Sequence, residues 1–141
     1  MEKFELREDV KIQNPQSDPT VFIADGAKVI GDAIMKANSS IWYNTVARAD
    51  INQIIIGERS NIQDNSVMHL ENDQGVTIGD DVTIGHKAII HGCDIKDGAL
   101  IGMGSIIMNG ATIGKGAVIG AGAVVTENML VPDLALVIGV P

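Results

Sequence analysis

The sequence contains very few aromatic residues and almost no cysteine. Two Phe, one Trp and one Tyr occur among 141 residues, and Cys93 is the single cysteine. A core without large rings has to be narrow and filled by Ile, Val, Leu and Ala. One cysteine cannot form an internal disulfide, so a reducing compartment is expected.

Positive charge and long apolar runs are also scarce. Ten Lys and Arg stand against 18 Asp and Glu, which gives a formal net charge of −8. Nucleic-acid binding depends on Lys and Arg that neutralise phosphates, so we expect no nucleic-acid partner. No apolar run approaches the roughly 18 residues of a membrane span, and the opening MEKFELREDV lacks the apolar core of a signal peptide. The sequence therefore predicts a cytoplasmic protein without a membrane partner.

The sequence does contain sixteen Gly and an apolar residue that recurs at every sixth position. The period is unbroken through Ile95, Ile101, Ile107, Ile113, Ile119, Val125 and Val131. A helix requires apolar residues at a spacing of 3.6 and a half-exposed strand requires a spacing of two, so neither explains six. A fixed short period is typical of a β-solenoid in which each hexapeptide forms one flat strand. We therefore predict an all-β fold, a parallel β-helix with a triangular cross-section.

The chain is expected to form a single β-helix domain over 1–141. Residues 1–20 are a lead-in without the period, and the alternating apolar and charged residues at 4–12 predict an edge strand. Hexapeptide coils are predicted over 21–131, with three extra residues after Ala47 and a protruding loop from His69 to Val76. Residues 132–141 are predicted to be a closing segment.

The three histidines of the chain fall at related positions of this repeat. Three hexapeptides make one turn of a triangular coil, so residues three hexapeptides apart stack about 4.8 Å apart on one face. If the excursions bulge outward without changing the order of faces, His69 and His91 are neighbours, whereas His86 lies around a corner. Other polar residues lie on these two faces. Arg48 shares the face of His69 and His91, whereas Gln63 and Asp64 share the face of His86.

Two stacked histidines can bind a metal, although a catalytic zinc ion usually takes three protein ligands and a water molecule. His86 cannot easily reach the pair of its own chain, but it can reach the pair of an adjacent protomer. A threefold ring would close such a contact. The same packing would set Asp64 opposite Arg48 across the boundary. We therefore predict a metal site that is shared between chains.

Simpler interpretations exist for each of these residues. A histidine on a solenoid face is most often a surface residue without a ligand. Arg48 and Asp50 can form a local ion pair of little energetic value, and Asp64 lies in NIQDNS, which is rich in turn formers. The presence of all three histidines on two adjoining faces favours the metal site.

At these residues the sequence resembles the γ-class carbonic anhydrase-like family, over roughly Ile23 to Val131. The segments that carry the resemblance are WYNTVARADINQIIIGERSNIQDNSVMH, TIGDDVTIGHKAIIHGCDI and LIGMGSIIMNGATIG. The resemblance implies a left-handed parallel β-helix, an exception to the usual right-handed crossover. It also implies a homotrimer in which two histidines of one subunit and one of the next bind the metal.

The activity implied by the resemblance is a hydro-lyase that interconverts CO₂ and bicarbonate through a metal-bound hydroxide. Zn²⁺ is the expected metal, with Fe²⁺ or Co²⁺ as possible substitutes. Four residues occupy the family's motif positions for interface pairing and for orienting the bound water: Arg48, Asp50, Gln63 and Asp64. Ile51 stands where the family has a proton-shuttling glutamate, which leaves Glu71 as a possible shuttle. The family's C-terminal helix is expected to have no counterpart here.

Two other functions remain open. A hexapeptide acyltransferase uses the same coil, with one histidine as general base and an acyl-thioester as donor, but it does not need three histidines that converge between subunits. A non-catalytic trimer, a binding or assembly module that retains a metal for stability, would contain the same residues. Metal content and CO₂ hydration distinguish these functions.

Overall fold

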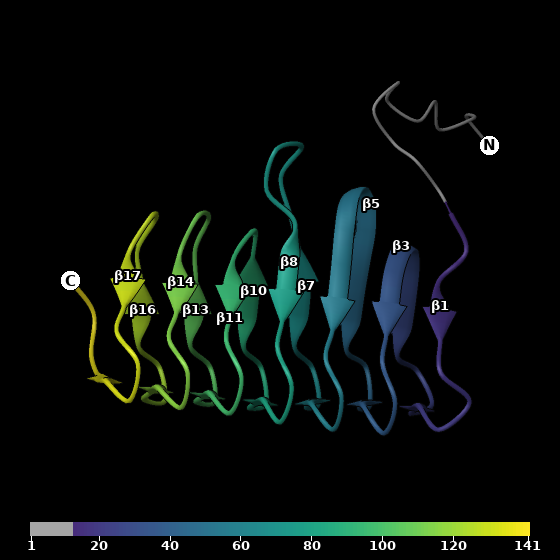
Figure 1. Ribbon diagram of the computed structural model, residues 1–141, viewed down its shortest axis with the longest axis horizontal. Coiled ribbons are helices and arrows are strands. Elements are labelled where there is room, and N and C mark those ends of the chain that lie inside the picture. The colour runs from purple at the N-terminus through teal and green to yellow at the C-terminus, as the bar shows by residue number, and fades with distance from the viewer. Residues whose placement is uncertain (1–12) are drawn as a thin grey trace.

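The computed structural model describes residues 13–141 as a solenoid of short parallel strands (Figure 1). The edge strand predicted at 4–12 lies outside the described residues. In chain order the strands are β1 (Gln16–Ser17), β2 (Phe22–Ile23), β3 (Lys28–Met35), β4 (Ser40–Ile41), β5 (Val46–Ile56), β6 (Asn61–Ile62), β7 (Val67–His69), β8 (Val76–Ile78), β9 (Thr83–Ile84), β10 (Ile89–His91), β11 (Asp94–Ile95), β12 (Leu100–Ile101), β13 (Ile106–Ile107), β14 (Thr112–Ile113), β15 (Val118–Ile119), β16 (Val124–Val125), β17 (Leu130–Val131) and β18 (Leu136–Val137).

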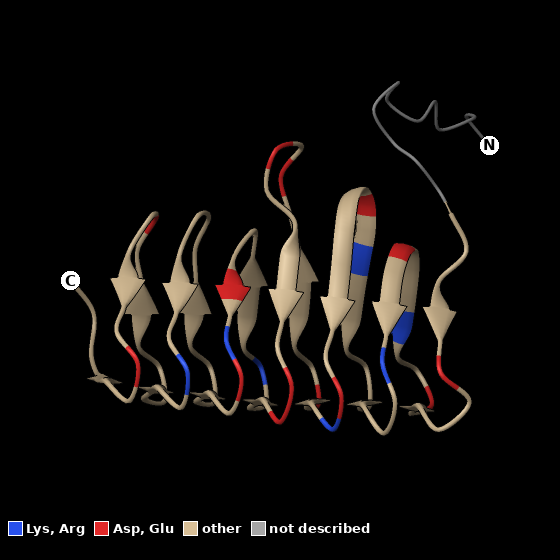
Figure 2. Cartoon of the chain, in the orientation of Figure 1, with Lys and Arg blue, Asp and Glu red and all other residues tan. Residues whose placement is uncertain are grey.

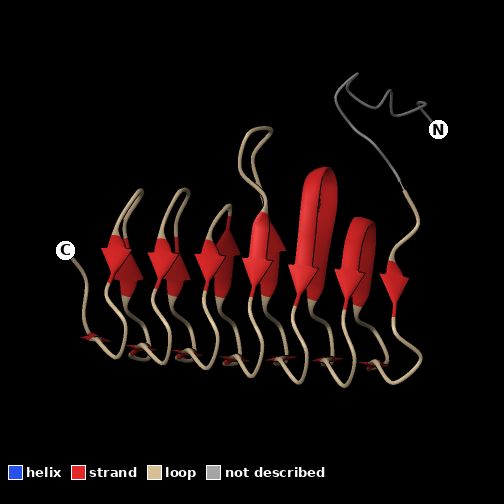
Figure 3. Cartoon of the chain, viewed as in Figure 1, coloured by secondary structure: helices blue, strands red, loops and turns tan. Residues whose placement is uncertain are grey.

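The strands form two sheets that wrap three faces of a prism. A seven-stranded sheet has the order β18-β15-β12-β9-β6-β4-β2. An eleven-stranded sheet has the order β16-β13-β10-β7-β5-β8-β11-β14-β17, with β1 and β3 attached to it. Within residues 13–141 all strands are paired in parallel and no helix occurs (Figure 3). The prediction of an all-β, left-handed parallel β-helix is confirmed, with about seven turns.

The six-residue period places one apolar side chain per strand inside the prism. Ile101, Ile107 and Ile119 are fully buried. The small residues four positions later, such as Ser105 and Ala123, are also fully buried. The Ser105 hydroxyl donates to the Gly102 carbonyl at 2.7 Å, so this buried polar group is satisfied.

Two excursions from the period shape the face that carries the paired histidines. The strand β5 bends over a corner: its first part pairs with β7 and its last part, Ile54–Ile56, pairs with β8. The second excursion is the loop at 70–75, which projects between β7 and β8 (Figure 1). Both the extra residues after Ala47 and the loop were predicted. A similar bend in β3 was not predicted, because its residues keep the six-residue spacing.

Charged residues lie mainly in turns and corners, and in the bends of β3 and β5 (Figure 2). The paired strands therefore present mostly uncharged side chains on the outer surface. Strand pairing continues into β1 and β18, so the repeated architecture reaches beyond 21–131 on both sides. No helix among residues 13–141 is long and apolar enough to cross a membrane.

The buried ladder predicts a sharp contrast between adjacent residues of β8. Ile78 is 1% exposed, whereas Thr77 is exposed. Ile78→Ala should lower the free energy of unfolding by about 2–5 kcal/mol, because it leaves a cavity in a core that cannot collapse around it. Thr77→Ala, the matched control, should cost less than about 1 kcal/mol. Urea unfolding followed by circular dichroism measures both, and equal losses would contradict this account of the core.

Candidate metal centre

His69 and His91 stand side by side at the ends of two neighbouring strands. The parallel register of β7 and β10 aligns Val67 with Ile89 and His69 with His91, as the six-residue period predicts. Nδ1 of His69 lies 3.2 Å from Nε2 of His91. The ring centroids are 5.2 Å apart, and both side chains are partly buried. The strand pairing alone is therefore enough to bring the two imidazole rings together.

Each imidazole is held on its outer side by an oxygen atom. Nε2 of His69 lies 2.8 Å from Oδ1 of Asp50, and Nδ1 of His91 is hydrogen-bonded to Oδ1 of Asn109. Arg48 donates to the second oxygen of Asp50 and holds that carboxylate in place. A carboxylate or an amide oxygen can only accept, so the outer ring nitrogens carry the hydrogens. When both rings are neutral, the two inner nitrogens therefore carry the lone pairs.

This donor set fits a metal ion. Two nitrogen ligands on a tetrahedral zinc ion, each bound at about 2.0–2.1 Å, are separated by about 3.3–3.4 Å. The inner nitrogens of His69 and His91 are 3.2 Å apart, close to the separation of two such ligands. Outer oxygen partners of this kind are typical of metal-binding histidines. Within residues 13–141, no group of three His, Cys, Asp or Glu side chains is placed to hold a metal ion.

Asp50 is ionised in this arrangement. Burial acts to raise the pKa of its carboxyl group, but hydrogen bonds from His69 and Arg48 outweigh burial and hold that pKa below its ordinary value. An ionised Asp50 is an acceptor only, which keeps the hydrogen of His69 on Nε2.

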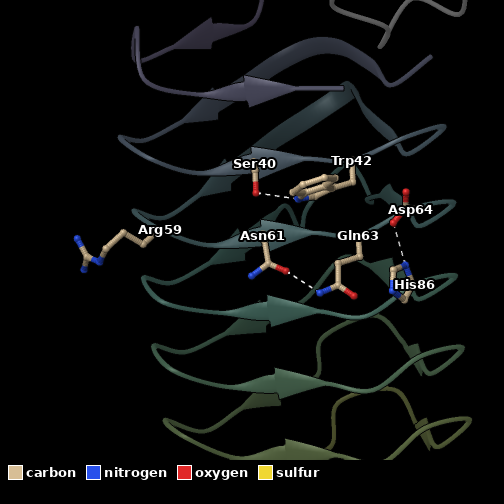
Figure 4. Close-up of a pocket in the computed structure, with 7 residues that line it drawn as sticks. All are labelled: Ser40, Trp42, Arg59, Asn61, Gln63, Asp64 and His86. Carbon is tan, nitrogen blue, oxygen red and sulfur yellow. Dashed lines mark hydrogen bonds and ion pairs between the residues drawn. The ribbon is translucent and has the colours of Figure 1, made fainter. Parts of the chain in front are cut away.

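His86 lies on a different face, in the turn after β9. Its Nδ1 is 2.9 Å from Oδ2 of Asp64, and half of its side chain is exposed. The Asp64 carboxylate accepts from Nδ1, which leaves Nε2 as the nitrogen with a lone pair. Beside it is an open cavity of about 530 Å³ (Figure 4). Its lining residues are Ser40, Trp42, Arg59, Asn61, Gln63, Asp64 and His86.

Gln63 projects into this cavity with a fixed orientation. Its Nε2 donates to Oδ1 of Asn61 at 3.0 Å (Figure 4). Its carbonyl oxygen is therefore the end that is left to accept a hydrogen bond from a bound molecule. Arg59 also lines the cavity, but its side chain points away from the other residues (Figure 4), and its guanidinium forms a bidentate pair with Asp81.

The predicted site residues thus fall into two groups within one chain. The first contains Arg48, Asp50, His69, Glu71 and His91, and the second contains Gln63, Asp64 and His86. Arg48 pairs with Asp50 within the chain, as the simpler interpretation held, and its contact with Asp64 of a neighbour stays a prediction.

Asn61 and Asn109 were missed by the sequence analysis. Asn109 follows β13, which is the neighbour of β10 in the sheet. Its place in the repeat, one coil beyond His91 on the same face, was the only feature of the sequence that could have indicated its role.

Comparison with known proteins agrees with this fold. Residues 92–127 match the model described as bacterial transferase hexapeptide (six repeats), and residues 53–85 match the hexapeptide repeat of succinyl-transferase. A crystal structure from Bacillus cereus, provisionally named as an acetyltransferase, is 43% identical with a TM-score of 0.90, over 95% of this chain and 81% of that one.

Curated relatives include carbonic anhydrases. The chain is 44% identical over 81 residues to a carbonic anhydrase of Geobacillus kaustophilus, which is 57% of this chain and 44% of that protein. It is 46% identical over 87 residues to the mitochondrial gamma carbonic anhydrase 2 of Arabidopsis thaliana, which is 57% of this chain and 31% of that protein. The matched part thus spans less than half the length of these relatives.

The fold and the likeness to solved structures define a hexapeptide-repeat β-helix protein. Within that class, the chain is similar to γ-class carbonic anhydrases, over 57% of its length.

The lowered pKa of Asp50 predicts a pH dependence of stability. A carboxyl group whose pKa is lower in the folded state stabilises it above the unfolded pKa of about 3.9, and that contribution is lost as the pH falls through the folded pKa. Asp50→Asn in metal-free protein should therefore flatten the fall in unfolding free energy below about pH 4. Urea unfolding at pH 2 to 6 tests this. Asp73→Asn removes the same charge from an exposed loop position, and an equal flattening there would contradict a specific role for Asp50.

Proposed function

We propose that the protein is a metal-dependent hydro-lyase that hydrates CO₂ reversibly to bicarbonate. The observation that carries this proposal is the pair of imidazoles, with outer nitrogens held by Asp50 and Asn109 and inner nitrogens 3.2 Å apart. Zn²⁺ is the expected metal, with Fe²⁺ or Co²⁺ as alternatives. His69 and His91 of one chain and His86 of the next would hold it. Cytoplasmic placement stays a prediction.

A homotrimer would complete the site, and two apolar surfaces support one. The face of the paired histidines presents a ladder of partly or fully exposed β-branched residues: Val46, Val67, Ile89, Ile106 and Val124. The face of His86 carries an apolar groove with Leu100, Met103 and Val118 on its walls. Burying such surface stabilises an assembly by about 25 cal/mol per Å². A contact between two different faces is heterologous, and it closes into a ring of three where successive protomers are rotated by about 120°.

The residues around the site have distinct tasks in this reaction. A bound metal ion of this kind lowers the pKa of a coordinated water to about 7. Asp50 and Asp64 hold the hydrogens of His69 and His86 on the nitrogens that point away from the site. Gln63, fixed by Asn61, presents an acceptor oxygen that would orient a hydroxyl group in the cavity. The half-exposed carboxylate of Glu71, with Oε1 3.9 Å from Nδ1 of His91, is the possible carrier of protons to solvent.

The alternative function is a hexapeptide acyltransferase. The descriptions of the matched family models and the provisional name of the Bacillus cereus protein support it. Such a transferase requires one histidine as general base. It gives no reason for the inner nitrogens of two imidazoles to be held at about the separation of two zinc ligands, so the geometry favours the metal-dependent reaction.

A site shared between chains predicts complementation between two inactive variants. His69→Ala and His86→Ala should each lose metal as separate trimers. Refolded together, they form mixed trimers in which one of the three boundaries joins an intact His69–His91 pair to an intact His86. Metal measured by elemental analysis should return in part in the mixture. Metal that stays at the level of the separate variants would contradict the shared site.

The missing shuttle glutamate predicts modest CO₂ hydration that depends on buffer. Ile51 cannot carry a proton, so turnover should rise with the concentration of an imidazole-type buffer. Glu71→Gln should lower turnover without removing the metal, and Ile51→Glu should raise turnover and weaken the buffer dependence. Stopped-flow hydration with metal-loaded trimer measures this. A rate equal to the buffer blank at all concentrations would defeat the enzyme proposal and favour a non-catalytic, metal-stabilised trimer.

A further inference from the structure

We infer that Asn109 is a positioning residue for His91 and that Glu71 sets the orientation of its amide. This inference rests on the metal site of the proposed function, and it assigns Glu71 a task in addition to proton transfer. The amide would keep the hydrogen of His91 on Nδ1, so that Nε2 presents its lone pair to the metal.

The strand register brings Asn109 to His91. Ile90 pairs with Ile107, so Asn109 stands next to Gly92 in the neighbouring coil. The backbone nitrogen of Gly110 donates to the Gly92 carbonyl at 2.7 Å, which ties the two turns together. From this position Oδ1 of Asn109 is hydrogen-bonded to Nδ1 of His91.

Glu71 determines which end of the amide faces the imidazole. Nδ2 of Asn109 donates to Oε1 of Glu71 at 3.1 Å. The reversed amide would place its oxygen against a carboxylate, and two acceptors repel each other. The carbonyl end of Asn109 is therefore directed to His91, and a carbonyl oxygen there requires a hydrogen on Nδ1.

Two further contacts hold this arrangement. Gly92 has a φ of +48°, and a Cβ at this position would lie 3.2 Å from Oδ1 of Asn109, so the amide occupies the space that a side chain would take. The loop that carries Glu71 is fixed from the bend of β5, because Nδ2 of Asn52 donates to the carbonyls of Glu71 at 3.1 Å and Asn72 at 3.0 Å.

The two histidines are thus held by partners of different charge. His69 donates to an anionic carboxylate, whereas His91 donates to a neutral amide that is itself oriented by a carboxylate. Outer partners of metal-binding histidines typically contribute 10- to 100-fold in metal affinity. We expect Asn109 to contribute in that range although it never touches the metal.

The test compares three variants by two readouts that do not depend on activity. Asn109→Leu keeps the branched shape of the side chain, with a somewhat larger volume, but removes the acceptor. Glu71→Gln combined with Asn109→Asp restores the pair with the donor and acceptor exchanged, and the new carboxylate can still accept from His91. Glu127→Gln is the matched control, because residue 127 aligns with residue 109 in the next coil and lines the same polar cavity.

The first readout is the tautomer of His91, from ¹⁵N NMR of the metal-free protein at neutral pH. The second is Zn²⁺ affinity, from competition with a chelator. Asn109→Leu should remove the preference for hydrogen on Nδ1 and weaken Zn²⁺ binding by about 10- to 100-fold. The exchanged pair should recover most of the tautomer preference and most of the Zn²⁺ affinity. Glu127→Gln should change neither the tautomer nor the affinity. Circular dichroism and urea unfolding verify that each variant is folded.

An unchanged tautomer together with an unchanged affinity in folded Asn109→Leu would overturn the inference. Failure of the proposed function has a different result: the wild-type protein would bind Zn²⁺ without hydrating CO₂, while the variants still differed as described. If the wild-type protein bound no Zn²⁺, the tautomer of His91 would still decide the role of Asn109.

Discussion

Parallel strand stacking is the constraint on which the rest of this structure depends. Each coil repeats the path of the previous one, so a side chain is followed by another about 4.8 Å away on the same face. Buried ladders of Ile and Ala fill the prism, and polar ladders on the outside bring side chains together without any long-range folding device. His69 and His91 meet because their strands are neighbours in this stack.

The narrow prism also explains where variation is tolerated. Its interior holds one medium-sized and, in most hexapeptides, one small buried side chain, so extra residues have to leave the coil. The bend of β5 and the loop at 70–75 are two such departures, and they lie in adjacent coils. Together they surround the paired histidines with Asp50 and Glu71, which are the carboxylates that hold the site.

The sequence predicted the fold and the register of the histidines because a strict period needs no knowledge of tertiary contacts. The buried series from Ile95 to Val131 and the pairing of His69 with His91 follow from counting residues. The bend of β3 could not be predicted from the sequence, because its residues keep the six-residue spacing. Asn109 could not be assigned because its role depends on the conformation of the loop that carries Glu71 and on the missing side chain at Gly92.

The location of the site within the stack has a mechanical consequence. In a linear array each coil contacts only the coils beside it, so local opening begins at the ends and spreads inward one interface at a time. The paired histidines and their partners lie between β5 and β13, with further coils on either side. Fluctuations of the terminal coils therefore have to cross intact interfaces before they reach the site. The outer coils therefore protect the geometry of the paired histidines from local opening at the ends of the stack.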